Sequence, residues 1–157
     1  MKIEKLGTVL LTTGELTITD PCYDKGTWCT ANLKNVFKGL WEASLEFTDC
    51  GSWGTRVSAL HFNAVGQTGG FFKKTKDEIG VDAGVCGIFE NKPNYTDDDW
   101  DNLNFWPARG GMAKLTNGFR CNGCWSHSGL GDGGYRAAIS KNSDGQIVGI
   151  KVIYLED

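Results

Sequence analysis

Apolar and polar residues alternate in several short segments of the chain, which is the pattern of a strand that buries one face. The alternation is most regular in residues 41–47 (WEASLEF) and 56–62 (RVSALHF), and the glycine-containing stretch between them is typical of a turn. Residues 134–140 and 146–155 flank Asp144-Gly145, and an Asp-Gly pair between two strands is a strong hairpin signal. We therefore expect two antiparallel hairpins in these regions.

Two further segments predict strands with less regular patterns. Residues 7–19 are rich in Val and Thr and predict a hairpin that turns at Thr13-Gly14. That hairpin ends before Pro21, because proline cannot donate to a strand ladder. Residues 80–89 are apolar and interrupted by glycine, which predicts a buried strand with a bulge or a close backbone approach.

No long amphipathic helix and no internal repeat is visible in the sequence. Residues 31–38 predict one short helical turn, and residues 96–100 (TDDDW) predict an N-capped helical turn inside a long excursion at residues 91–111. We expect one domain over residues 1–157, mainly β (a β-rich α+β fold), built as an antiparallel sandwich or a strongly curled sheet with one or two short helices.

Composition supports a folded, turn-rich chain. Glycine accounts for 22 of the 157 residues, about double the usual share of roughly 7%. Hydrophobic residues make up 40% and charged residues 22%, which excludes a disordered chain. The net charge of −3 excludes the basic face of a duplex nucleic-acid binder, and no apolar run is long enough to span a membrane. No apolar signal-peptide core follows residues 1–5, so we expect a cytoplasmic location, in a bacterium or a phage-infected host cell.

The six cysteines are expected to be reduced in that compartment. Cys121 and Cys124 form a CxxC pair, and His127 follows three residues later. These three residues are candidate zinc ligands, with a fourth ligand from Cys22, Cys50 or Cys86. The alternative is a set of buried thiols that pack as small hydrophobic side chains. We predict no cofactor, and keep zinc or another divalent cation as an alternative.

Three segments combine aspartate with small or aromatic residues: residues 20–23 (DPCY), 81–89 (VDAGVCGIF) and 126–135 (SHSGLGDGGY). Asp82 lies in an apolar stretch and is expected to be buried, where a carboxylate must be paired, metal-bound or hydrogen-bonded. Together with Asp20 and Asp132 it is a candidate divalent-cation ligand. The other interpretation is ordinary turn chemistry, in which aspartate caps amides and glycine adopts positive φ.

His127 is the candidate general base, because its ordinary pKa is near 6.5. Cys22 or Cys124 could form a thiol–imidazole pair with it. His61 lies on a predicted strand, where a structural role is favoured. Tryptophans near turns could stack on a flat ligand, although a packing role is the commoner one; they are Trp28, Trp53, Trp100, Trp106 and Trp125.

The order DPCYxxGTWC, VDAGxxGxF and SGxGDGGY resembles a widespread family of small, functionally uncharacterised bacterial and phage proteins. The resemblance extends from about residue 7 to residue 155. This chain departs from the family pattern at Cys86, Glu90, His127 and Leu130. The resemblance implies no assigned activity, and the phage distribution of the family implies a role against host defence. The matching positions are Asp20, Pro21, Cys22, Tyr23, Trp28, Cys29, Asp82, Gly84, Gly87, Phe89, Gly129, Gly131, Asp132, Gly133 and Tyr135.

These features together favour a small-molecule-binding domain, with a phage anti-defence protein that sequesters a nucleotide-like signal as its sharper form. One alternative is a hydrolase acting on a small phosphorylated or nucleotide substrate through aspartate residues, with Asp82, His127 and Asp132 as catalytic candidates. Another is a protein-interaction inhibitor that binds a host partner through the acidic residues 97–101. Homo-oligomerisation stays open. The predicted ligand-binding residues are Asp20, Tyr23, Trp28, Asp82, Gly84, Gly129, Gly131, Asp132, Gly133 and Tyr135.

Overall fold

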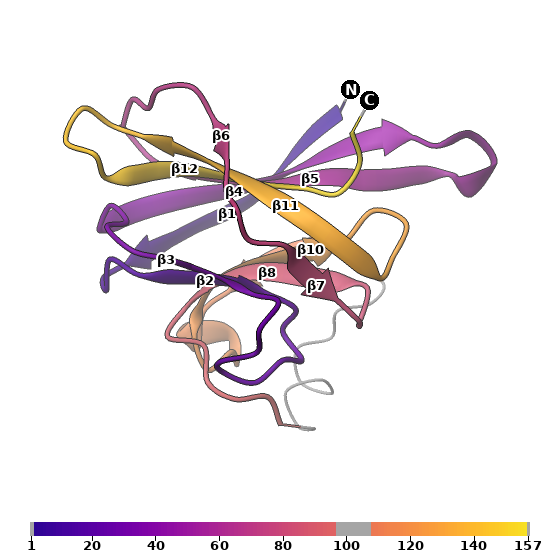
Figure 1. The fold of residues 1–157 in the computed structure, drawn as a ribbon, viewed down its shortest axis with the longest axis horizontal. Coiled ribbons are helices and arrows are strands. Elements are labelled where there is room, and N and C mark those ends of the chain that lie inside the picture. The colour runs from indigo at the N-terminus through magenta and orange to yellow at the C-terminus, as the bar shows by residue number, and fades with distance from the viewer. Residues whose placement is uncertain (1, 97–107, 157) are drawn as a thin grey trace.

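Two antiparallel sheets face each other in a β-sandwich, which confirms the predicted fold class (Figure 1). This computed structural model describes residues 2–96 and 108–156. The larger sheet has the order β1 (Lys2–Leu11), β4 (Gly39–Asp49), β5 (Thr55–Ala64), β12 (Ile147–Ile153), β11 (Gly133–Lys141) and β6 (Lys73–Lys74), and β7 (Ile79–Val81) also pairs with β11. The smaller sheet has the order β3 (Ala31–Leu33), β2 (Leu16–Thr19), β8 (Val85–Glu90), β10 (Asn122–His127) and β9 (Gly110–Ala113).

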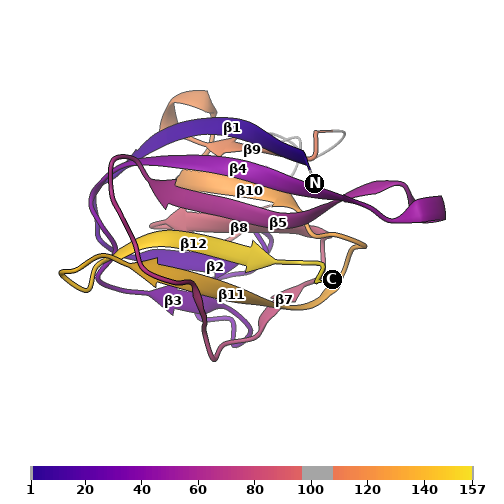
Figure 2. The same cartoon turned by 90° about the horizontal axis from the view of Figure 1, so that it is seen from above.

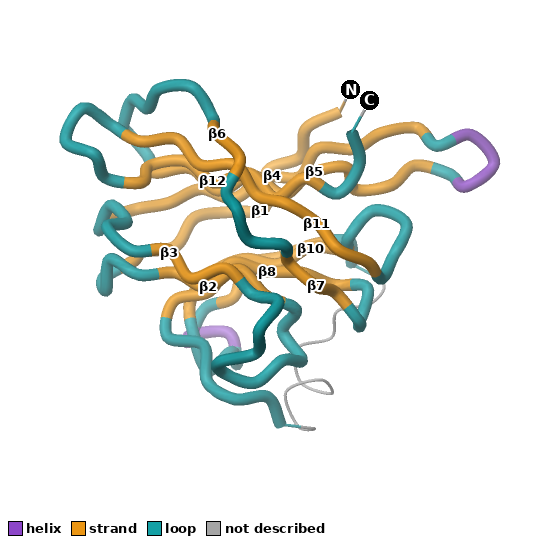
Figure 3. Tube along the Cα trace, in the orientation of Figure 1, coloured by secondary structure: helices purple, strands orange, loops and turns teal. Residues whose placement is uncertain are grey.

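Helical structure is confined to two single turns in the described part of the chain (Figure 3). They are the 3-10 turns η1 (Gly51–Trp53) and η2 (Leu115–Asn117). Neither comes near the length or apolarity of a membrane-spanning helix, nor does any other described segment.

Both regular hairpins predicted from alternation are present. In β4 the residues Trp41, Ala43, Leu45 and Phe47 are buried, while the residues between them are more exposed. β4 pairs with β5, and β11 pairs with β12. The turn between β11 and β12 is closed by Gly145 N–H, which donates to the Asn142 carbonyl at 3.0 Å.

The predicted hairpin at residues 7–19 is wrong. β1 pairs with β4, whereas β2 pairs with β3 and β8 in the opposite sheet. The chain does reverse here, but the Thr12 and Thr13 N–H groups donate to the Glu90 carboxylate at 2.8 and 2.9 Å instead of continuing a ladder. Leu11 and Leu16 are both buried between the sheets. A turn signal predicts the reversal of the chain, but not the sheet that the next strand joins.

Two other local predictions also need correction. Residues 31–33 form strand β3 rather than a helical turn, because Ala31 and Leu33 are buried with Asn32 exposed between them. The strand predicted at residues 80–89 is two strands, β7 and β8, separated by an exposed turn. The helical turn predicted at residues 96–100 lies largely outside the described residues, as do the acidic residues 97–101.

The main hydrophobic core lies between the two sheets and draws residues from both. Its largest members include Trp41 and Phe62, whose rings are 5.0 Å apart between centroids. A second, smaller cluster around Phe89 and Trp125 packs on the outer face of the smaller sheet. In the view from above, the strands of both sheets run in a similar direction, and the β4–β5 hairpin projects beyond the other strands (Figure 2).

We call this projecting end, residues 48–57, the arm. The pairing of β1 with β4 ends at Phe47, and the pairing of β12 with β5 ends at Ala59. Beyond these positions β4 and β5 pair only with each other, with Asp49 opposite Thr55. The arm therefore forms a two-stranded wall at the side of the sandwich.

Candidate functional site

The first two aspartate-bearing segments are joined by the carboxylate of Asp20, which is fully buried. Its Oδ2 accepts hydrogen bonds from the N–H groups of Asp82 and Ala83, both at 2.8 Å. Its Oδ1 accepts from the Cys22 N–H at 2.8 Å. Three amide donors thus offset the cost of burying this charge. Asp20 holds the two loops together and presents no carboxylate oxygen to solvent.

The third segment attaches to the second through backbone and tyrosine contacts. Ser128 N–H donates to the Gly84 carbonyl at 3.1 Å, which ties the glycine-rich loop to the turn after β7. The Tyr135 hydroxyl lies within hydrogen-bond distance of the carbonyls of Ser128 and Gly131, so its one proton can be shared between them and holds the loop to β11. The three segments therefore meet at one end of the sandwich, although about a hundred residues separate the first from the third in the sequence.

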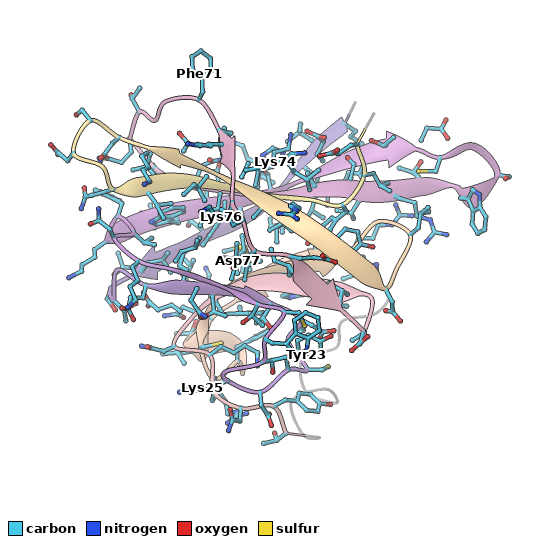
Figure 4. All side chains as sticks on the ribbon, viewed as in Figure 1. Tyr23, Lys25, Phe71, Lys74, Lys76 and Asp77 are labelled. Atoms are coloured by element: carbon cyan, nitrogen blue, oxygen red, sulfur yellow. The ribbon has the colours of Figure 1, made fainter. Side chains whose placement is uncertain are left out.

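The expectation that Asp82 is buried is wrong, because Asp82 is exposed, and of the three aspartates it is Asp20 that is buried. The apolar pattern of residues 80–89 breaks after Val81, where the chain turns outward through Gly84 at φ +70°. The Tyr23 hydroxyl donates to Asp82 Oδ2 at 2.6 Å. Burial, assisted by the Asp82 carboxylate, raises the pKa of Tyr23, so Tyr23 stays a hydrogen-bond donor. Figure 4 shows Tyr23 among the loops beside β7.

An open cleft of about 1000 Å³ lies between the arm and these loops. Several predicted site residues line it: Asp82, Gly84, His127, Gly129, Gly131 and Asp132. Others do not, namely Asp20, Tyr23, Trp28, Gly133 and Tyr135. Asp20, Tyr23 and Tyr135 instead support the loops from behind through the hydrogen bonds above. The Trp28 side chain is 89% exposed and lies outside the cleft.

Sequence reasoning missed two arginines that line the cleft. Arg56 belongs to the arm, beside Trp53, and Arg109 lines the cleft from the position just before β9. Arg56 Nε donates to the Trp53 carbonyl at 2.8 Å, and Arg109 Nη1 donates to the Thr55 carbonyl at 2.6 Å. Nothing in the sequence marked these arginines, because one lies in a regular hairpin and the other in a long excursion.

Several amides of these loops are used within the protein and are not free to bind an anion. The N–H groups of Asp82 and Ala83 donate to Asp20, and the Gly131 N–H donates to the Ser128 carbonyl at 3.0 Å. The cleft therefore has a cationic wall made by arginine side chains rather than by the glycine loop. Asp82 and Asp132 make the opposite side acidic.

The predicted thiol–imidazole pairs meet different obstacles. Cys22 and His127 line the same cleft, but burial and the nearby Asp20 charge raise the pKa of the Cys22 thiol to about 12. A thiol that stays protonated at neutral pH is a weak nucleophile. Cys124 is fully buried and points to the core, on the opposite face of β10 from His127. His61 plays the structural part expected of it, since its Nε2 lies 3.3 Å from Glu46 Oε1 on the neighbouring strand.

The candidate zinc site at Cys121, Cys124 and His127 is not formed. Cys124 faces the main core, whereas Cys121 packs in the outer cluster with Trp125. Strand β10 separates them because successive side chains point to opposite faces of a sheet. No group of three metal-ligating side chains occurs among the described residues, and the three aspartates are no exception, since the Asp20 oxygens are occupied by amides. All six cysteines are free thiols in the structure.

The tryptophans divide between exposed and buried positions. Trp53 is 67% exposed and lines the cleft, while Trp125 is buried in the outer cluster. Trp100 and Trp106 lie outside the described residues. Among the tryptophans of residues 2–96 and 108–156, Trp53 is therefore the one that lines this cleft and is placed to stack on a ligand there.

Comparison with protein-family models, with curated protein sequences and with solved structures finds no match for this chain. The function is therefore inferred from the geometry of the cleft.

Proposed function

We propose that this protein binds a small, polar, nucleotide-like molecule in the cleft between the arm and the three aspartate-bearing loops. The observation that carries the proposal is the convergence of these loops on one hollow of about 1000 Å³. Ligand sites are commonly concave and of about 300–1,000 Å³, with a few polar groups that converge on the ligand. The residues that line this cleft provide such groups on two facing walls.

Each wall suits a different part of such a ligand. On the loop side, Asp82 and Asp132 can accept hydrogen bonds from ligand hydroxyl or amino groups. On the arm side, the exposed ring of Trp53 offers a flat apolar face for a base. Asp82 is held in place by the Tyr23 hydroxyl, so one of its oxygens is already oriented before a ligand arrives. This preorganisation favours affinity because less side-chain freedom is lost on binding.

Binding is favoured over hydrolysis by the state of the candidate nucleophiles. The Cys22 thiol is protonated at neutral pH, and the Asp20 carboxylate is engaged by three amides. A hydrolase remains the second candidate because His127 and Asp132 line the same cleft. In that case His127 would act as general base for a water molecule.

The experiment that separates these functions is incubation of the purified protein with a panel of nucleotides and cyclic or linear dinucleotides. After separation of unbound ligand and denaturation, the released compounds are identified by mass spectrometry. A binding protein returns a panel member intact, whereas a hydrolase returns its product. If no panel member co-purifies with the protein or shifts its melting temperature, the proposed function is wrong.

The site assignment is tested with a double variant, Asp82→Asn with Asp132→Asn. We expect its affinity for the panel ligand to fall about tenfold or more, because charged acceptors become neutral amides. The matched control is Asp144→Asn, an exposed aspartate in the β11–β12 turn, which should bind like the wild type. Equal affinities of the double variant and the wild type, measured by calorimetry, would contradict the assignment.

The wider role follows from the resemblance to bacterial and phage proteins. We propose that a ligand held in this cleft is a signal nucleotide kept from its receptor in the host cytoplasm. This role needs binding without turnover, so the same incubation tests it. The alternative of an inhibitor that binds a host protein through residues 97–101 stays a prediction, since those residues lie outside the described part.

A further inference from the structure

The two arginines of the cleft are both anchored to the arm by backbone carbonyls. Arg56 Nε donates to the Trp53 carbonyl and Arg109 Nη1 donates to the Thr55 carbonyl, at 2.8 and 2.6 Å. The acceptors belong to residues two apart in the chain, so both guanidinium groups are held to the same short stretch of the arm. A guanidinium carries five N–H donors, and each of these contacts uses one of them.

Neither guanidinium is neutralised by a carboxylate within the described residues. The ion pairs found there are Lys5–Glu42, His61–Glu46 and Lys74–Glu156, and none involves the cleft arginines. The acid of the arm itself, Asp49, accepts the Gly51 N–H at 2.8 Å and shapes the turn at the tip. Two cations held to the same stretch of the arm, with no carboxylate partner among the described residues, are stabilised when an anion binds both of them.

Arg109 is further restrained by packing. Its guanidinium carbon lies 5.7 Å from the centroid of the Phe47 ring, and Phe47 is a buried core residue at the base of the arm. The cation–π contact with Phe47 and the hydrogen bond to the Thr55 carbonyl together limit the positions of this side chain. Arginine restrained in this way loses little freedom when its planar fork meets the oxygens of a phosphate.

We infer that the arm wall is an anion subsite in which Arg56 and Arg109 bind a phosphate or pyrophosphate group of the ligand. The inference rests on the proposed function and deepens it by giving the ligand a charge and an orientation. The anionic group faces the arm, because Asp82 and Asp132 on the opposite side repel it. The hydrogen-bond-donating groups of the ligand then face these aspartates.

The test is calorimetric titration of the full chain with inorganic pyrophosphate and with the panel ligand. We expect Arg56→Gln and Arg109→Gln each to weaken binding of both about tenfold, and the double variant to weaken it about a hundredfold. Arg56→Lys should lie between wild type and Arg56→Gln, because lysine keeps the charge but loses the fork. Arg56→Lys also serves if the glutamine variants fail to fold, because it keeps a cation in the cleft and removes only the guanidinium fork.

Arg136→Gln is the matched control. Arg136 is an exposed arginine whose Nη1 donates to the Lys76 carbonyl at 2.8 Å, yet it lies outside the cleft. It should bind both probes like the wild type, and added salt should weaken wild-type binding more than binding by the double variant.

Three results would contradict the inference or its premise. If the glutamine variants bind pyrophosphate and the panel ligand as tightly as wild type, the arginines serve only to hold the arm. If the panel ligand binds but its affinity is independent of the arginines, the anion subsite is wrong while the proposed function stands. If wild type binds neither probe nor any panel member, the proposed function itself fails.

Discussion

The three aspartates at the loop ends have two different roles, and Asp20 differs from Asp82 and Asp132. The DPCY segment made it a candidate ligand residue, but its carboxylate faces inward and accepts three backbone N–H groups. Asp82 and Asp132, which carry no stronger sequence signal, are the aspartates that line the cleft. What separates the roles is the number of amide donors within reach, and two of the three come from a loop about sixty residues away.

Replacing Asp20 with asparagine should therefore destabilise the fold. An amide nitrogen cannot accept a hydrogen bond, so at least one of the three N–H donors loses its partner and the charge that strengthens the others is gone. We expect the free energy of unfolding to fall by about 2–3 kcal/mol, the range for a buried charged hydrogen-bond network.

Urea denaturation followed by tryptophan fluorescence measures this change. Asp132→Asn is the control, because Asp132 is exposed and its replacement should alter stability by less than about 0.5 kcal/mol. Equal urea midpoints for Asp20→Asn and the wild type would show that the carboxylate does not hold the loops together.

At the scale of elements, the pairing of β8 with β10 decides how the candidate site is held together. Gly123 of β10 lies opposite Phe89 of β8, and a Cβ added at Gly123 would lie 2.0 Å from the Ile88 carbonyl oxygen. The backbones of the two strands approach so closely here that only glycine fits. β10 leads to His127, and β8 begins directly after the turn at residues 82–84. The register of the two strands therefore sets how that turn lies against the glycine-rich loop on the loop side of the cleft.

Gly123→Ala should consequently break this register. We expect a loss of about 3 kcal/mol, because the methyl group meets rigid backbone and not a flexible side chain. Gly118→Ala is the matched control, since Gly118 also has a positive φ (+95°) but nothing within 4 Å of an added Cβ. It should cost only about 1 kcal/mol of backbone strain. Chemical denaturation of both variants checks the difference, and similar losses at the two sites would exclude the clash as the cause.

Across the whole molecule, buried thiols and tyrosines connect the two sheets. Ser126 Oγ of β10 lies 2.8 Å from the hydroxyl of Tyr154, which follows β12 in the opposite sheet. Burial raises the pKa of the Cys86 thiol to about 12 and raises those of Cys124 and Tyr154 well above their ordinary values. These groups are therefore neutral in the folded protein at pH values where they would ionise in the unfolded chain.

The protein should lose stability in alkaline solution. In the unfolded chain Cys86 ionises near its ordinary pKa of 9.0, while in the folded state it stays protonated to about pH 12. Its contribution is thus fully present below pH 9 and is lost as the pH rises from 9 to 12. At pH 10.5 this group alone should lower the free energy of unfolding by about 2 kcal/mol relative to pH 7.

Urea midpoints measured between pH 7 and pH 10.5 under reducing conditions test this expectation. Cys86→Ala removes this ionising thiol. Between pH 7 and pH 10.5 the free energy of unfolding of the variant should therefore fall less than that of the wild type, by about the same 2 kcal/mol. Only the slopes are compared, because the variant also loses packing at every pH. Parallel declines in the two proteins would contradict the assignment to Cys86.

The sequence by itself determined the class of the fold and the two hairpins β4–β5 and β11–β12. Alternation along a strand depends on neighbours within a few residues, and an Asp-Gly turn joins strands that are already adjacent. The same local signals misplaced β2, because the choice between two sheets depends on which apolar face is free far away in the chain. Local patterns carry no information about that choice.

Only the tertiary structure decided which residues share the cleft. It brought Asp82, His127 and Asp132 to one hollow, turned Asp20 and Tyr135 into supports, and separated Cys121 from Cys124 across a sheet. It also added Arg56 and Arg109, which no motif contains. The physical reason is that a site is made by strand pairings between distant segments, whereas a motif records only the turn chemistry within each one.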